Sequence, residues 1–300
     1  MSAPGWTEVR VLVPQGWEEL VAETLASGPC TSVAFGRPTL ASAEAPAGFD
    51  YVRTFVASAA DTPALRAELR ERLDALAARS EVPELAQLAL VFRELPPEDY
   101  ARSWMKVWKP FRVGHLAVVA PWKESALRID DVRMELEPGG AFGSGRHATT
   151  RTCLAVLQER LRPGARLVDA GSGSGILAVA AALFGAREAV GFDIDPNATP
   201  WAEELARRNG AERRARFLTA GFECLPGLGR FDALVANIYA DVVIEHIAEL
   251  RDALEPGAWF AFSGCTLQHA AATREAIEQS GLALQEVRVR GRWHTFAGIR

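Results

Sequence analysis

The chain has 300 residues, of which 49% are hydrophobic and 24% charged, with a formal net charge of −5 at pH 7. This composition is that of a globular enzyme with room for two cores of ordinary size. No apolar run approaches the roughly 20 residues that cross a bilayer, and the first ten residues lack the basic start and apolar stretch of a signal peptide. An acidic chain does not favour nonspecific nucleic-acid binding. We therefore expect a cytoplasmic protein that binds neither membranes nor nucleic acid directly.

The four cysteines, Cys30, Cys153, Cys224 and Cys265, form no C-x-x-C pair, and the five histidines form no H-E-x-x-H pattern. This spacing argues against a metal site or a disulfide framework and favours buried thiols. Charge is distributed unevenly, because residues 1–95 carry 8 Lys and Arg against 13 Asp and Glu. An acidic front end suits a basic partner, and a solvated helix face explains the same charges about as well.

In residues 1–95, stretches with the hydrophobic repeat typical of strands alternate with stretches that have the repeat typical of helices. The long helix carries Leu65, Leu69, Leu73 and Leu76 on one face. The order β-α-β-β-α-β predicts a small α+β domain of the ferredoxin-like type, which hosts many functions. The predicted strands are residues 7–13, 31–35, 51–58 and 88–95, and the predicted helices are residues 16–27 and 62–79.

Residues 96–125 form a predicted connector that is rich in Trp, Lys and Pro and holds a strand at residues 115–120. Its tryptophans, Trp104, Trp108 and Trp122, suit a substrate path. A hydrophobic seam between two domains is the more ordinary explanation, and we favour it.

From residue 166 onward strands and helices alternate regularly, which predicts a parallel, doubly wound α/β sheet with helices on both faces. Residues 282–290 and 293–299 then form two strands around Gly291-Arg292, a terminal antiparallel hairpin that a nicotinamide dehydrogenase does not normally have. The preceding strands are expected at residues 167–171, 189–194, 215–220, 233–238 and 259–264, and the helices at residues 176–184, 196–209, 241–254 and 267–280.

A glycine-rich turn follows the first of these strands, in Asp169-Ala-Gly-Ser-Gly-Ser-Gly175. Glycines let a backbone approach a ligand closely, and the helix that follows offers unpaired N–H groups. The G-x-G-x-G spacing differs from the G-x-G-x-x-G of NAD enzymes. Alone, the turn could serve topology only.

The next strand ends at Asp193, 22 residues beyond Gly171. A carboxylate at this position can accept hydrogen bonds from both hydroxyls of a ribose. Asp195 and Pro196 are interpreted as the N-cap and first residue of the following helix. We therefore assign Asp193 a role in ligand binding and Asp195 a structural role.

Two further segments carry side chains that are suited to ligand binding or catalysis. The loop at residues 139–150 combines glycines and hydroxyls with Phe142 and His147, as a lid over a ligand would. His147 is a candidate general base, although a positioning or capping role is equally compatible. Asn237 ends the fourth strand, where its amide oxygen can accept from an amine and its NH₂ can donate to a cofactor.

The combination A-F-G-S-G-x-H-x-T-T, D-x-G-S-G-S-G-I-L-A, G-F-D-I-D-P and V-A-N-I resembles the bacterial ribosomal protein L11 methyltransferase family over about residues 104–264. The resemblance implies a seven-stranded, Rossmann-like class I methyltransferase domain at residues 126–300. It also implies a substrate-recognition domain at residues 1–95 and S-adenosylmethionine as cofactor. We expect a monomer that methylates amino groups of ribosomal protein L11, on lysine side chains or at the N-terminal amine. The candidate catalytic residues are Asn237 and His147, and the candidate cofactor residues are Phe142, Thr150, Asp169, Gly171, Gly173, Gly175, Asp193 and Asn237.

The chain departs from the family pattern in three respects. Ser144 replaces a threonine and keeps the hydroxyl. Tyr239 replaces a small or aliphatic residue and would narrow the acceptor channel. The N-terminal domain matches by architecture more than by residues, so a methyltransferase for another protein or for a small amine is the main alternative. A noncatalytic, cofactor-sensing protein is a further alternative, which the intact lid sequence disfavours.

Overall fold

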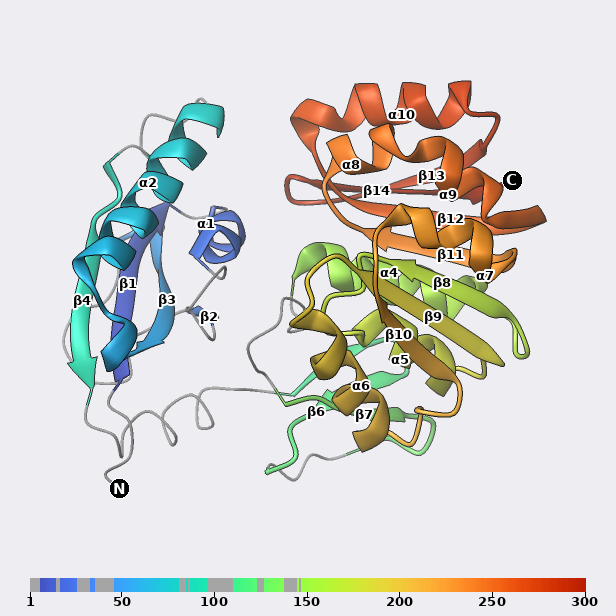
Figure 1. Cartoon of the computed structure of the whole chain (residues 1–300), viewed down its shortest axis with the longest axis horizontal. Helices are drawn as coiled ribbons and strands as arrows, with labels where there is room; N and C mark the ends of the chain where they lie inside the picture. Colours follow the sequence, from blue (N-terminus) through green and yellow to red (C-terminus); the bar gives the residue numbers. More distant parts are fainter. Residues whose placement is uncertain are drawn as a thin grey trace. The chain divides into compact units, whose positions relative to one another are not determined.

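A computed structural model of the chain (Figure 1) describes residues 6–14, 17–25, 33–35, 46–80, 85, 87–95, 110–122, 127–137, 145 and 147–300. The chain divides into two compact units. The first comprises residues 1–109 with 138–140, and the second comprises residues 110–137 with 141–300. Phe142, Trp104 and Trp108 lie outside the described residues.

The first unit holds a four-stranded antiparallel sheet in the order β2-β3-β1-β4. Alternate valines of its central strand form one core with the leucines of the long helix. Leu65, Leu69, Leu73 and Leu76 are all buried, which confirms the apolar face predicted for this helix. The elements are β1 (Trp6–Pro14), α1 (Glu18–Leu25), β2 (Val33–Phe35), β3 (Phe49–Ala57), α2 (Pro63–Ser80) and β4 (Leu90–Leu95).

The second unit is built on a seven-stranded sheet in the order β10-β9-β8-β11-β12-β14-β13. The first five strands in this order run parallel, and β14 is antiparallel to both β12 and β13. The sheet is therefore mixed, with one reversed strand, β14, inserted near its edge. The strands are β8 (Arg166–Ala170), β9 (Glu188–Asp193), β10 (Ala215–Thr219), β11 (Phe231–Asn237), β12 (Leu254–Thr266), β13 (Ala283–Arg290) and β14 (Trp293–Ile299).

Helices cover this sheet, and α8 and α10 pack together over the strands β11–β14 (Figure 1). The predicted helix at residues 241–254 is wrong as a single element. It is two short helices that meet at His246, whose ring stacks on Phe222 with centroids 4.0 Å apart. The helices are α4 (Ala148–Arg160), α5 (Ile176–Leu183), α6 (Ala198–Arg208), α7 (Leu225–Leu228), α8 (Ala240–Glu245), α9 (Ile247–Asp252) and α10 (Ala270–Gln279). Within the described part of the chain, no helix has the length and apolarity required to cross a membrane.

A separate three-stranded sheet belongs to the same unit. It consists of β5 (Phe111–Val113), β6 (Leu116–Val119) and β7 (Val132–Glu135). Only β6 was predicted. The side chain of Asn209, at the end of α6, joins β7 to this helix by accepting from the Glu135 N–H (2.7 Å) and donating to the Glu135 carbonyl (2.8 Å).

The expected capping role of Asp195 is wrong. Helix α6 begins two residues later than predicted, at Ala198, with Asn197 as its N-cap residue. The Asp195 carboxylate accepts from the backbone and the side-chain amide of Asn197, both at 2.9 Å. This local turn, which aspartate forms readily, occupies the residues before the helix.

Ile238, directly after β11, fixes the carboxyl end of the sheet. A Cβ atom at Gly171 would lie 2.2 Å from the Ile238 Cγ2 atom, and one at Gly264 would lie 2.1 Å from the Ile238 carbonyl oxygen. Both glycines also have positive φ angles, +71° and +90°. The ends of β8 and β12 therefore leave room for Ile238 only because both residues lack a side chain. This packing sets the position of Asn237.

We predict that Gly264→Ala destabilises the chain more than Gly257→Ala does. Gly257 also has a positive φ, +79°, but nothing lies within 4 Å of its Cβ position, so that variant carries only the backbone strain of about 1 kcal/mol. Gly264→Ala adds the clash with Ile238, a further loss of about 2 kcal/mol in the free energy of unfolding. Urea denaturation measures both; equal losses would show that Ile238 is not tightly held.

Candidate active site

The residues predicted to bind a ligand gather at the carboxyl ends of the parallel strands. The glycine turn follows β8, Asp193 ends β9 and Asn237 ends β11. His147 and Thr150 lie at the start of α4, and a hydrogen bond joins Thr150 to Asn237. This edge is where open α/β sheets bind ligands.

The backbone conformation and packing of the chain already require glycine in this turn, before any ligand is considered. Gly171, Gly173 and Gly175 all have positive φ angles, between 49° and 77°. A Cβ atom at Gly175 would lie 2.7 Å from the Ala202 Cβ atom and 2.8 Å from the Phe217 ring. The glycines of this turn therefore serve the fold as well as any ligand. The backbone N–H groups at the start of α5 are those that a ligand would contact.

Asp193 ties the glycine turn to the end of β9. One of its carboxylate oxygens accepts from the Gly173 N–H at 2.8 Å and the other from the Asp195 N–H at 2.9 Å. The residue is half-buried. Because a carboxylate has about four lone-pair positions, both oxygens retain capacity for further donors. The geometry suits a vicinal diol.

Asp169 is a buried acid directly below the turn. Its side chain has no exposed surface, one oxygen accepts from the Ala178 N–H at 3.2 Å, and the other has no hydrogen-bond partner. Burial raises the pKa of Asp169 to about 7, and the negative charge of Asp193 acts in the same direction. An unsatisfied buried oxygen is costly, so this position favours a donor group on a ligand.

His147 caps helix α4. Its Nδ1 atom accepts from the Thr149 N–H at 3.2 Å, and its ring meets that of Trp293 edge-on, with centroids 4.9 Å apart. Burial lowers the pKa of His147 to about 4, so the imidazole is neutral at neutral pH. Trp293, which belongs to β14, was not among the predicted site residues, because only a loose match at the end of the chain pointed to it.

Asn237 is oriented by a residue 87 positions away. Its Nδ2 atom donates to the Thr150 Oγ1 atom at 3.2 Å. In this orientation the threonine hydroxyl is the acceptor. The amide oxygen is then available to accept from an incoming amine.

Three exposed apolar side chains border this edge. Ile194, Tyr239 and Leu267 follow β9, β11 and β12 and are 79%, 53% and 70% exposed. Exposed apolar groups around a polar site are typical of surfaces that contact a ligand or a protein partner.

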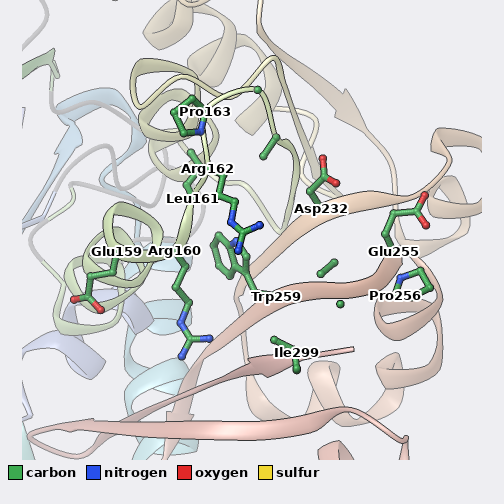
Figure 2. Close-up of a pocket in the computed structure, with 14 residues that line it drawn as sticks. Glu159, Arg160, Leu161, Arg162, Pro163, Asp232, Glu255, Pro256, Trp259 and Ile299 are labelled. Atoms are coloured by element: carbon green, nitrogen blue, oxygen red, sulfur yellow. The ribbon is translucent and has the colours of Figure 1, made fainter.

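A cavity of about 700 Å³ lies at the opposite edge of the sheet (Figure 2). It is lined by the loop before β8, by Asp232 at the start of β11 and by Trp259 in β12. Figure 2 shows Arg162, Glu255 and Asp232 around it. None of the predicted site residues lines this cavity, so we do not assign it to the candidate active site.

We predict that Asp169→Asn removes a pH-dependent part of the stability. The raised pKa of Asp169 means that the folded chain holds a proton that the unfolded chain, with an aspartate pKa of about 3.9, releases. The resulting stabilisation is complete below about pH 4 and is lost as the pH rises through about 7. The Tm of the wild-type chain should therefore fall relative to that of the variant between about pH 4 and 7 and then level off. Parallel Tm curves would contradict the raised pKa.

Comparison with known proteins identifies the family of the chain. The family model described as "Ribosomal protein L11 methyltransferase (PrmA)" matches residues 5–300. A protein of that name from Geobacter sulfurreducens is 36% identical over 295 residues, covering 96% of each chain. One from Thermus thermophilus is 40% identical over 205 residues, covering 68% of this chain and 78% of that one.

A solved structure of a ribosomal protein L11 methylase from Lactobacillus delbrueckii subsp. bulgaricus has a TM-score of 0.60 at 28% identity. It covers 64% of this chain and 99% of that one. The resemblance predicted from the motifs is therefore confirmed, and the mixed seven-stranded sheet is that of a class I methyltransferase. The chain belongs to the ribosomal protein L11 methyltransferase family.

Proposed function

We propose that this chain transfers methyl groups from S-adenosylmethionine to amino groups of ribosomal protein L11, on lysine side chains or at the N-terminal amine. The observation that carries the proposal is the Asn237 amide, held by Thr150 at the carboxyl end of β11. It presents an acceptor for an amine N–H beside the acidic and glycine-rich ends of β8 and β9. Membership of the family supports the choice of protein substrate.

S-adenosylmethionine is the cofactor of this methyltransferase family, and the residues present fit it. Asp193 keeps lone pairs for a ribose diol, and Asp169 has a buried oxygen without a partner. The N–H groups at the start of α5 would face the polar end of the cofactor. When bound, the cofactor supplies a methyl group on a cationic sulfonium.

The chain's own contribution is orientation. A lysine amine has a pKa of about 10.4 and must be neutral before it attacks a methyl group. Burial beside a cation favours the neutral form. The Asn237 oxygen would accept one N–H of that amine and direct its lone pair, which is catalysis by proximity.

We do not propose His147 as a general base. Its Nδ1 atom caps α4, and a group whose pKa is about 4 is a weak base toward an ammonium ion. Its contact with Trp293 supports a positioning role for both rings.

We also propose the domain organisation that the sequence predicted. Residues 1–95 would form a ferredoxin-like substrate-recognition domain, residues 96–125 a connector and residues 126–300 the methyltransferase domain. The strand order β2-β3-β1-β4 supports the first assignment. The 13 acidic against 8 basic residues of this domain suit a basic protein substrate. The enzyme would act as a monomer in the cytoplasm.

Intact-mass spectrometry of ribosomal protein L11 from the same organism tests the proposed function. With the wild-type chain and S-adenosylmethionine we expect increments of one CH₂ unit per methyl group, and fragmentation to place them on amines. Asn237→Ala should lower the rate about 100-fold, because the amine loses its orienting acceptor. Binding of S-adenosylhomocysteine by this variant should change much less. Cofactor binding without any increment would contradict the proposed substrate.

Two substitutions separate the roles of His147. We expect His147→Asn to keep turnover within a few-fold, because asparagine is also an effective N-cap residue. His147→Ala should lose about 1 kcal/mol of stability through the missing cap. Initial rates and Tm values of both variants provide the measurement. If both abolished turnover while still binding cofactor, His147 would be a base and the capping account would be wrong.

A further inference from the structure

Helix α4 and the edge strand β13 face each other through paired charges. Arg288 in β13 donates to Glu159 at 3.0 Å, and Arg160 in α4 lies 3.4 Å from Glu286. These pairs alternate in sign, so each charge in this part of the interface has an opposite partner.

The same interface continues to a pair of like charges. Arg290 lies opposite Trp293 on β14, and the Trp293 ring contacts His147. The His147 carbonyl accepts from the Arg151 N–H at 3.0 Å, one helical turn along α4. This series of contacts places Arg290 and Arg151 on the same side of the candidate active site.

Neither arginine has a carboxylate partner among the described residues. Arg151 donates through Nη2 to the Arg112 carbonyl at 2.9 Å, and its guanidinium lies 5.3 Å from the centroid of the Phe111 ring. Its Nε atom is buried without a hydrogen-bond partner, and Arg290 is exposed near the end of β13. Burial, and then the positive charge of Arg290, lower the pKa of Arg151.

We propose that Arg151 and Arg290 form a binding site for a carboxylate of the acceptor protein, an Asp or Glu side chain close to the amine that is methylated. Arginine presents a fork of N–H donors that matches a carboxylate. Arg151 is partly exposed and Arg290 exposed, and neither has a carboxylate partner among the described residues. The site would fix the acceptor segment beside Asn237. This inference rests on the proposed function.

The position of the pair favours the acceptor over the cofactor as the source of the carboxylate. Strand β13 is at the edge of the sheet, four strands from β8, which carries the glycine turn. At about 4.8 Å per strand the separation is about 19 Å. The carboxylate of the acceptor protein is therefore the occupant that we propose, because Arg290 is exposed on the edge strand and is accessible to a protein.

Substitution of Arg290 tests the site, because stability and binding should move in opposite directions. Arg290→Gln removes a like charge, and Arg290→Glu supplies a carboxylate to Arg151. The Tm of the unliganded chain should therefore rise in the order wild type, Arg290→Gln, Arg290→Glu. The Kd for ribosomal protein L11, measured by calorimetry with S-adenosylhomocysteine present, should weaken about 10-fold in Arg290→Gln and further in Arg290→Glu. Arg213→Gln, an exposed arginine in the turn before β10, is the matched control and should change neither quantity.

Three results would overturn the inference. An unchanged Kd for ribosomal protein L11 would show that Arg290 does not bind a carboxylate of the acceptor protein. A weaker Kd with a lowered Tm would assign Arg290 a structural role. A comparable loss of affinity for S-adenosylhomocysteine alone would assign the site to the cofactor. A wild-type chain that does not methylate ribosomal protein L11 would instead contradict the proposed function.

Discussion

The packing of Ile238 against two glycines is the constraint on which the candidate site depends. Gly171 begins the glycine turn directly after β8 and Gly264 lies in β12, and neither position accommodates a Cβ atom beside Ile238. Three strand ends are thereby held together, and Asn237, the residue before Ile238, comes within hydrogen-bond distance of Thr150 in α4. Gly171, which belongs to the glycine turn that suggested a ligand loop, thus also helps to position the Asn237 amide.

Charge changes sign along the carboxyl edge of this sheet. Asp169 and Asp193 lie at the ends of β8 and β9, the neutral groups Asn237 and Trp293 lie between, and Arg290 lies near the end of β13. A cationic sulfonium is favoured at the acidic end, because opposite charges attract strongly in partly buried sites. An acceptor that approaches from the other end would meet apolar and basic groups, which disfavour the charged form of a lysine amine.

Much of this arrangement was predictable from the sequence, because it depends on local patterns. The strands that carry Asp169, Asp193 and Asn237 are continuous apolar runs, and their ends meet at one edge of any parallel sheet. The features that were missed depend on contacts between distant residues. Helix α8 ends where His246 stacks on Phe222, and Trp293 reaches His147 only through the antiparallel insertion of β14. No periodicity encodes such contacts.

A crystal structure of the chain with S-adenosylhomocysteine bound tests the central claim most directly. We expect ribose hydroxyls on the Asp193 carboxylate and the sulfur atom beside Asn237, with the Asn237–Thr150 bond intact. A ligand bound in the cavity at the opposite edge of the sheet, near Trp259, would contradict it. So would a ribose held by groups other than Asp193.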